Sequence, residues 1–287
     1  AEGSAVLALG TDTAGSVRIP AAWTGNVALK TTKGRWSTEG IVPLSTTLDT
    51  AGILARDVAD LRAGFRAFDP APGPVAEAHP EDLRLAIADA TVLWGDLDPG
   101  VGEAVEGALD ALRGAGARAG TAPLPFVDEV FELFQRGGPV SAELKAFLAD
   151  ELPDHLAALD PNVRTRIDDG AGIPAEEYLR RRRRLALLAM EANAALRETP
   201  LLVAPTVANG PPTLEALEDA AVYRRENVRC LRNTGVVSYL GLCALTLPCG
   251  EDGLGLPVGL QLIGRAGDEE RLLGAAAAIE RVLRGEG

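Results

Sequence analysis

The chain alternates between short apolar runs and longer stretches in which apolar residues recur at helical spacing. The runs "LRLAIA" (83–88) and "LLVAP" (201–205) have the length and composition of buried strands. The stretch 98–114 places an apolar residue on one face at each turn, which is typical of an amphipathic helix. This alternation predicts an α/β protein with a mixed sheet covered by helices.

The other elements are predicted on the same grounds. Further strands are predicted at 4–9 (buried, running into the loop 10–16), 26–30, 117–125 (an edge strand at best), 243–250 and 256–264, the last two paired across a Gly-rich turn. Further helices are predicted at about 126–136, 140–151, 174–198, 221–234 and 268–285. Residues 47–68 are predicted to become a helix around Ala55, and the proline-rich residues 69–80 a loop or linker. The helix-rich stretch 126–198 is a candidate cap or subdomain.

Composition excludes several classes of function. The chain has 287 residues, enough for a buried core, and a net charge of −13, which disfavours binding to nucleic acid. No apolar run approaches the ~20 residues of a membrane span, so no membrane partner is expected. The three cysteines, Cys230, Cys243 and Cys249, fit neither a zinc site nor a disulfide framework. We therefore expect a cytoplasmic protein without a metal site.

One serine stands in an unusual setting in "ALGTDTAGSVRIPAAW" (8–23). Small residues precede Ser16, so the backbone can approach a substrate carbonyl closely. The N–H groups of Thr13, Ala14, Gly15 and Ser16 are then candidate donors to an oxyanion. Asp12 and Arg18 are candidates to brace the loop by pairing across it. The alternative is a glycine-containing turn with a solvent-facing serine, and the local sequence does not exclude it.

Other ways of activating a serine fit less well. "GTDTAGS" is neither a G-x-S-x-G elbow nor a phosphate-binding loop. The only histidines, His79 and His155, lie in a proline-rich linker and on a polar stretch and are predicted to be on the surface. Lys30 and Lys33 follow Ser16 after a predicted strand, and their spacing places neither amine at Ser16.

A resemblance narrows the choice. "ALGTDTAGSVRIPAAWTGNVALKTTKGRWSTEGIVPLSTTLDTAGILARDVADL" (8–61) closely resembles the core block of the amidase signature family, and "LLVAPTV" (201–207) and residues 240–273 resemble its closing segments. The middle, 75–198, resembles the family mainly in rhythm. The resemblance implies one layered α/β/α domain around a large mixed sheet, with no cofactor. It also implies hydrolysis of linear carboxamide C–N bonds through an acyl-serine intermediate.

The family's residues carry over by position. The resemblance implies that Ser16 is the nucleophile, that the N–H groups of Thr13, Ala14, Gly15 and Ser16 form the oxyanion hole, and that Asp12 and Arg18 are scaffold. Its base is a lysine relayed by a second serine, and the segments that would carry both are expected before Ala1. Because the only methionine is Met190, we also expect the chain to be part of a longer protein or a processed product. Residues 1–287 are thus expected to be the C-terminal two-thirds of an amidase domain.

Other residues have structural and functional interpretations that the sequence leaves open. The five arginines 180–184 are a solvated helix face or a site for a carboxylate or an acidic partner. Trp23 and Trp36 belong to the core or to the acyl pocket. Asp49 is interpreted as scaffold, and the three cysteines as core or loop thiols.

Three functions remain in competition. The first is a small-molecule amidase, which we favour. The second is the glutaminase subunit of a tRNA-dependent amidotransferase. Such subunits usually have "IRQPA" after the nucleophile, whereas this chain has "VRIPA", with Ile19 in place of Gln. The third is a catalytically incomplete relative that only binds. The expected partners are a small amide substrate, an upstream segment in cis or in trans, and, as a possibility left open, a second copy of the chain.

Overall fold

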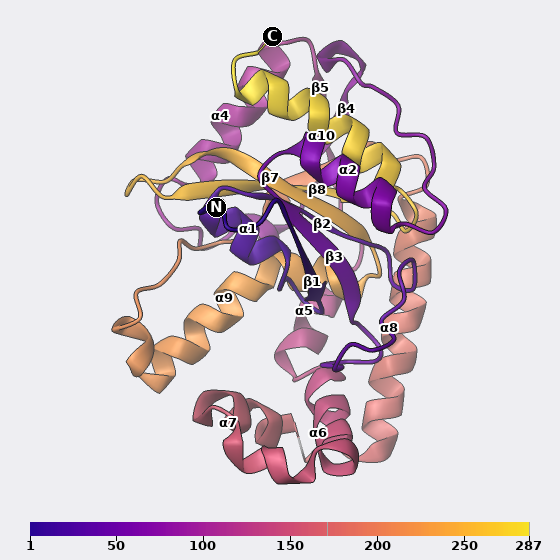
Figure 1. Cartoon of the computed structure of the whole chain (residues 1–287), viewed down its shortest axis with the longest axis vertical. Coiled ribbons are helices and arrows are strands. Elements are labelled where there is room, and N and C mark those ends of the chain that lie inside the picture. The colour runs from indigo at the N-terminus through magenta and orange to yellow at the C-terminus, as the bar shows by residue number, and fades with distance from the viewer. Residues whose placement is uncertain (171, 287) are drawn as a thin grey trace.

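The computed structural model describes residues 1–170 and 172–286 and shows a single eight-stranded mixed sheet with helices on both faces (Figure 1). The strands are β1 (Leu7–Asp12), β2 (Val27–Lys30), β3 (Thr50–Ala55), β4 (Arg84–Asp89), β5 (Arg118–Pro123), β6 (Leu201–Pro205), β7 (Cys243–Glu251) and β8 (Pro257–Gly264). Their order across the sheet is β1-β3-β2-β7-β8-β6-β4-β5. In this order, the neighbouring strands from β1 across to β6 pair antiparallel, whereas β4 pairs parallel with both β6 and β5. The predicted α/β class with a mixed sheet is confirmed.

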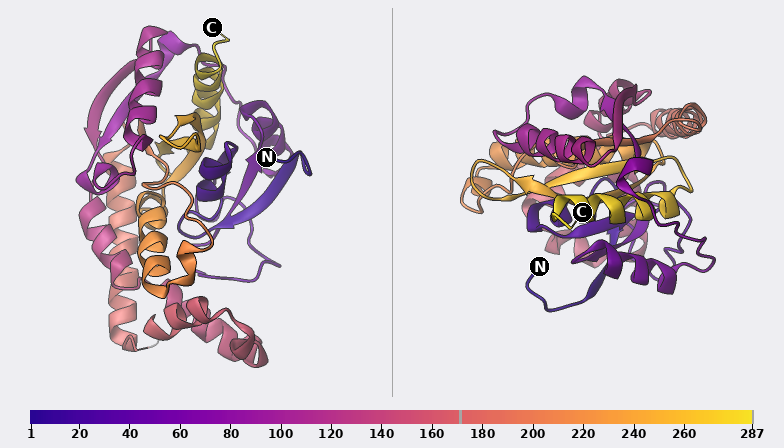
Figure 2. Two further views of the ribbon diagram at one scale, coloured as in Figure 1. Left: turned by 90° about the vertical axis from the view of Figure 1, so that its left-hand side faces the viewer. Right: turned by 90° about the horizontal axis from the view of Figure 1, so that it is seen from above.

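Helices cover the two faces of the sheet as separate layers (Figure 2). The helices are α1 (Arg18–Thr24), α2 (Val58–Phe68), α3 (Thr91–Trp94), α4 (Val101–Gly114), α5 (Val127–Gln135), α6 (Val140–Glu151), α7 (Pro161–Gly170), α8 (Ala175–Ala195), α9 (Ala220–Tyr239) and α10 (Glu269–Leu283). Helices α2, α4 and α10 pack on one face, and α3, α5, α8 and α9 on the other. The central strands β2 and β6 are buried along their whole length because both of their faces are covered.

The prediction for residues 47–68 is wrong in its first part. Residues Thr50–Ala55 form strand β3, which pairs with both β1 and β2, and α2 begins only at Val58. Asp57 sets this boundary, because its side chain accepts a hydrogen bond of 2.8 Å from the N–H of Asp60 and caps the helix. A six-residue apolar run that contains a glycine and leads directly into a helix carries little signal of its own as a strand.

The first strand also differs from expectation. It spans Leu7–Asp12 rather than 4–9, and it is an edge strand rather than a buried one. Helix α2 meets β1 at Leu7, which lies 3.0 Å from where Gly64 would carry a Cβ; Leu9, one pleat further on, is 61% exposed. The shift matters for the site, because the strand ends at Asp12. The loop of residues 13–17, which carries Ser16 and is called the serine loop below, follows directly.

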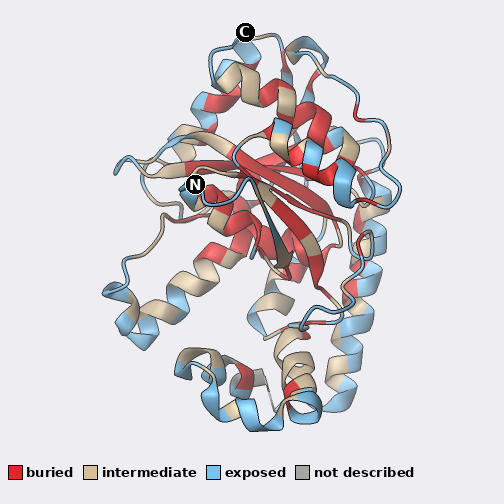
Figure 3. Cartoon of the chain, viewed as in Figure 1, coloured by how far each residue is buried: buried red, intermediate tan, exposed pale blue. Residues whose placement is uncertain are grey.

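The remaining predictions held with small changes of boundary. Residues 118–123 form an edge strand, and β7 and β8 pair as an antiparallel hairpin, both as predicted. Helix α9 runs on to Tyr239, beyond the predicted end at 234, and α3 and α7 were not predicted. Residues 126–198 comprise α5 to α8, of which α6 and α7 lie away from the sheet; most residues of α6 are intermediate in exposure (Figure 3).

Two kinds of feature are absent from the described part of the chain. Within residues 1–170 and 172–286, no helix has the length and apolar character that crossing a bilayer requires. The same described residues bring together no group of three or more His, Cys, Asp or Glu side chains suited to holding a metal ion.

Candidate functional site

Ser16 lies in a short loop between the end of β1 and the start of α1. The strand is held by β3 up to the pair Asp12–Thr50, and Thr50 also donates a side-chain hydrogen bond of 2.8 Å to the Asp12 carbonyl. Helix α1 begins two residues after Ser16. Ser16 is exposed, whereas Asp12, Gly15 and Val17 around it are buried. The loop therefore presents one hydroxyl to solvent from an otherwise packed backbone.

Gly15 is required by both conformation and space. Its φ is +147°, a region that side-chain-bearing residues rarely adopt. A Cβ at this position would lie 2.2 Å from Thr234 Oγ1 and 2.6 Å from Ile19 Cδ1. Thr234, on α9, also donates a hydrogen bond of 2.6 Å to the carbonyl of Ala14. Helix α9 thus fixes the loop on the side opposite to solvent.

The backbone N–H groups of the loop remain available as donors. Val17 N–H points back to Asp12 Oδ2 at 3.4 Å, and Ile19 N–H donates to the Gly15 carbonyl at 2.8 Å. Within the part of the chain that the structure describes, no acceptor takes the N–H groups of residues 13–16. Unengaged N–H groups beside an exposed hydroxyl have the composition of an oxyanion hole.

A buried ion pair joins the two ends of the loop. Arg18 Nε and Nη2 each donate a hydrogen bond of 3.0 Å to one oxygen of Asp12, and both side chains are fully buried. Burial by itself raises the pKa of Asp12, but the Arg18 guanidinium outweighs it and holds the pKa below its ordinary value. The carboxylate is therefore ionised at neutral pH and stays paired.

The guanidinium of Arg18 also ties the loop to α9 and to the centre of the sheet. It donates to Gln261 Oε1 on β8 at 2.6 Å, to Ser238 Oγ at 2.7 Å and to the Thr234 carbonyl at 3.1 Å. A bidentate guanidinium with every bond directed is a rigid anchor. Asp12 and Arg18, both predicted as scaffold, are thus brought together by the structure.

The carboxylate of Asp49 also holds the loop. Thr13 Oγ1 donates to Asp49 Oδ1 at 2.5 Å. Asp49 Oδ2 accepts the N–H groups of Leu44 and Ser45, at 2.8 and 2.9 Å. Asp49 therefore links the serine loop to the chain segment that precedes β3.

Neither nearby lysine bonds to Ser16. Lys30 Nζ is fully buried and donates to the carbonyls of Thr31 and Leu242, both at 3.0 Å. Burial lowers the pKa of Lys30 to about 8, and the charge of Arg18 adds to the effect. Lys33 Nζ donates to backbone carbonyls of the segment before β3. No hydrogen bond among the described residues joins a base to the Ser16 hydroxyl.

Sequence reasoning missed an aromatic neighbour of the site. A Cβ on Gly235 of α9 would lie 3.6 Å from the ring of Phe134 and 3.9 Å from the Ala14 carbonyl. Phe134 stacks on Phe131, also from α5, with ring centroids 6.1 Å apart. These rings lie in the stretch whose resemblance to a family is weakest, so no sequence signal marks them.

Trp23 and Trp36 both have structural contacts. Trp36 is buried in the core between Phe65 and Phe68 and donates to Asp69 Oδ2 at 2.8 Å. Trp23, on α1, donates to the carbonyl of Asn209 at 2.8 Å. The contacts of Trp36 are those of a core residue rather than of an acyl pocket.

The other candidates have structural surroundings. Both histidines are exposed, as predicted. In the arginine run, Arg184 forms a bidentate pair with Glu129, and Arg181 bonds to Glu177 and to the Arg136 carbonyl. The run is thus a helix face tied largely to its own chain.

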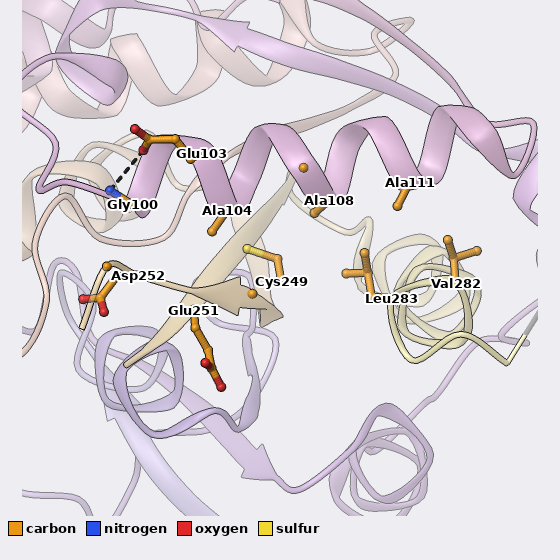
Figure 4. Close-up of a pocket in the computed structure, with 13 residues that line it drawn as sticks. Gly100, Glu103, Ala104, Ala108, Ala111, Cys249, Glu251, Asp252, Val282 and Leu283 are labelled. Atoms are coloured by element: carbon orange, nitrogen blue, oxygen red, sulfur yellow. Dashed lines mark hydrogen bonds between the residues drawn. The ribbon is translucent and has the colours of Figure 1, made fainter. Parts of the chain in front are cut away.

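A cavity of about 600 Å³ lies on the other face of the sheet (Figure 4). It is lined by α4, by the β7–β8 turn and by the end of α10, and Cys249 points into it. Burial raises the pKa of Cys249 to about 12, so its thiol is protonated at neutral pH and is a poor nucleophile. Ser16 does not line this cavity.

The fold and the serine loop together define a class of protein, and comparison with known proteins agrees. The amidase family model matches residues 1–273. The chain is 44% identical to the 2-amino-5-chloromuconic acid deaminase of Comamonas testosteroni, over 98% of this chain and 62% of that protein. It is 32% identical to the indoleacetamide hydrolase of Pseudomonas savastanoi, over 99% of this chain and 64% of that protein.

The structural comparison gives the same result. A crystal structure described as an amidase superimposes with a TM-score of 0.80 at 28% identity, over 96% of this chain and 62% of that one. This chain belongs to the amidase family. It spans a little over three-fifths of the length of these relatives.

Proposed function

We propose that this protein hydrolyses a linear carboxamide C–N bond through an acyl intermediate on Ser16. The observation that carries the proposal is the pairing of an exposed hydroxyl with unengaged N–H groups on one rigid loop. Attack by Ser16 Oγ on the amide carbon places negative charge on the carbonyl oxygen. The N–H groups of residues 13–16 supply hydrogen bonds to that charge, and Asp12 with Arg18 holds them in place. Collapse of this intermediate breaks the C–N bond and releases ammonia or an amine, which takes up the proton that the Ser16 hydroxyl gave to the base. Water then hydrolyses the ester, frees the acid and restores the Ser16 hydroxyl.

The general base is the part of the machinery that these contacts do not supply. A serine near its free pKa is a weak nucleophile and needs a base beside it. Lys30 and Lys33 are both bonded to backbone carbonyls. We therefore assign the base to the lysine and relay serine that the family resemblance implies, and we place both outside residues 1–287, in cis or in trans.

The substrate is proposed to be a small amide. Relatives whose names state a substrate include the deaminase of 2-amino-5-chloromuconic acid and the indoleacetamide hydrolase. The ring of Phe134 and the Ala14 carbonyl both lie against Gly235 of α9. We propose that this ring, on which Phe131 stacks, offers an apolar contact to the acyl part of such a molecule.

A glutaminase role is the alternative. The chain is 32% identical to a glutamyl-tRNA(Gln) amidotransferase subunit of Novosphingobium aromaticivorans, over 96% of this chain and 63% of that protein. At the position after Arg18 this chain has the apolar Ile19, which packs in a small cluster with Ala22 and Val207 and offers no amide to a polar substrate. This substitution favours the small-molecule amidase.

A covalent probe tests the proposal. The protein expressed from its full reading frame is treated with a fluorophosphonate, and the modified peptide is identified by mass. We expect label on Ser16, no label in Ser16→Ala, and full label in the matched variant Ser4→Ala, which removes another exposed serine. Amide hydrolysis that persists in Ser16→Ala at the level of the parent protein would contradict the assignment.

A further inference from the structure

Glu143, on α6, accepts several hydrogen bonds from the segment that leads into β3. Its Oε2 accepts the hydroxyl of Ser45 at 2.7 Å and the N–H of Thr47 at 3.0 Å. Its Oε1 accepts the hydroxyl of Thr47, and also that of Tyr178 on α8 at 2.8 Å. Glu143 and Tyr178 lie in the helix-rich stretch 126–198, and the residues they hold lie about a hundred positions earlier in the chain.

The residues that bind Glu143 belong to the segment 45–49, which Asp49 links to the serine loop. Ser45 offers its hydroxyl to Glu143 and its N–H to Asp49, so one residue joins the two carboxylates. Asp49 in turn accepts the hydroxyl of Thr13. An unbroken path of hydrogen bonds therefore runs from α8 through α6 and residues 45–49 to Thr13, three positions before the nucleophile.

The segment is also fixed from its other side. Lys33 Nζ donates to the carbonyls of Thr46 and Asp49, at 2.8 and 3.0 Å. The carboxylate of Glu143 thus takes the hydroxyls and an N–H group, while the ammonium of Lys33 takes the carbonyls. Removing either group leaves polar atoms of one side without partners.

The surroundings of Glu143 favour the ionised carboxylate. The carboxylate is half-buried, and its donors are neutral hydroxyl and N–H groups. Burial raises the pKa of Glu143, but the bonds from Thr47, Ser45 and Tyr178 outweigh it and lower the pKa below its ordinary value. The carboxylate is therefore ionised at neutral pH and accepts these hydrogen bonds.

We infer that Glu143 is a positioning residue for the oxyanion hole: it sets the geometry of residues 13–16 through residues 45–49 and Asp49, and it couples that geometry to α6 and α8. The inference rests on the proposed function only for the meaning of the oxyanion hole, since the mechanical link is testable without turnover. It assigns to the stretch 126–198 a role in assembling the site.

Hydrogen–deuterium exchange tests the link in the protein expressed from its full reading frame. The reporters are the N–H groups of Val17 and Ile19, whose acceptors are Asp12 Oδ2 and the Gly15 carbonyl. The test variant is Glu143→Gln, which keeps the shape but offers one acceptor oxygen where several donors converge. The matched control is Glu132→Gln, an exposed residue of α5 whose side chain, among the described residues, pairs with Arg136 alone, at 3.7 Å.

In Glu143→Gln we expect exchange at the two reporters to accelerate about tenfold, the ratio that corresponds to losing one hydrogen bond to a charged group. Amides of β7 and β8 should exchange as in the parent protein, which shows that folding is intact. Tyr178→Phe should produce a smaller acceleration at the same reporters. Exchange that accelerates only in residues 41–49, with Val17 and Ile19 unchanged, would overturn the inference.

Fluorophosphonate labelling separates this inference from the proposed function. If Ser16 is labelled in the parent, we expect the labelling rate to fall about tenfold in Glu143→Gln and to be unchanged in Glu132→Gln. An equal rate in all three proteins would overturn the coupling to the oxyanion hole. An absence of label even in the parent, with the exchange results as expected, would overturn the nucleophile and leave the mechanical link standing.

Discussion

Replacing Lys30 by methionine should remove a specific pH dependence of the free energy of unfolding. The ammonium is fully buried, and its pKa falls from 10.5 to about 8. A difference of this size corresponds to roughly 3 kcal/mol between the two protonation states. The folded protein bears this cost in full below pH 8, where the folded and unfolded states are both protonated.

The sign follows from proton linkage. Between pH 8 and pH 10.5 the unfolded state binds more protons at this lysine than the folded state, so stability contributed by Lys30 rises with pH. It rises by up to ~1.4 kcal/mol per pH unit and levels off above pH 10.5. In Lys30→Met this contribution is absent. The free energy of unfolding of the parent minus that of the variant should therefore increase by ~3 kcal/mol between about pH 7 and pH 10.5.

Urea unfolding followed by circular dichroism at several pH values measures this difference. Comparing the two proteins cancels the other titrating groups to first order, and Lys145→Met, on the exposed side of α6, controls for the loss of one positive charge. The absolute stability of Lys30→Met is not the test, because the carbonyls of Thr31 and Leu242 lose their donor. Parallel pH curves for the parent and Lys30→Met would contradict a lowered pKa of Lys30 in the folded protein.

Three further outcomes follow from the site. Gly15→Ala should lower the melting temperature measured by calorimetry, by an amount equivalent to ~2 kcal/mol or more, because of its φ and the 2.2 Å contact; an unchanged melting temperature would contradict the packing. Asp12→Asn should cost ~3–5 kcal/mol in urea unfolding at about pH 7, since it leaves a buried guanidinium unpaired; a loss below about 1 kcal/mol would argue against the ion pair as anchor. Replacing His79 and His155 together should leave kcat within a few-fold, whereas a ~10⁴-fold loss would indicate a histidine base.

Much of the sheet follows from the sequence because its central strands are buried on both faces. Runs such as 201–205 are then continuously apolar, and their neighbours in the chain are amphipathic helices. Strand β3 was not predicted, because its apolar residues lead closely into those of α2. The capping carboxylate of Asp57 marks the boundary between the two elements. Local pattern therefore identifies elements better than it divides them.

The serine loop is identified from the sequence because its residues are contiguous. Asp12, Gly15, Ser16 and Arg18 lie within seven positions, so their association needs no tertiary information. The partners of the loop come from far along the chain. Thr234 and Gly235 on α9 contact the loop across more than two hundred positions, and a threonine or glycine in a helix gives no sign of such a contact.

Glu143 shows the same limit more sharply. In the sequence it is one acidic residue on a helix of ordinary composition. Its importance appears only when α6 lies against residues 45–47 and several donors converge on one carboxylate. Tertiary placement, rather than residue type, distinguishes it from the exposed Glu132.

The most direct test of the account is to trap the acyl intermediate. The protein expressed from its full reading frame is mixed with a small aryl amide, quenched in acid during the first turnover, digested and analysed by mass spectrometry. We predict that the peptide carrying Ser16 gains the mass of the acyl group less one hydrogen, and that Ser16→Ala shows no adduct and no turnover. Turnover in the parent with no adduct on that peptide, or an adduct on another residue while Ser16→Ala stays active, would contradict the claim that Ser16 is the nucleophile.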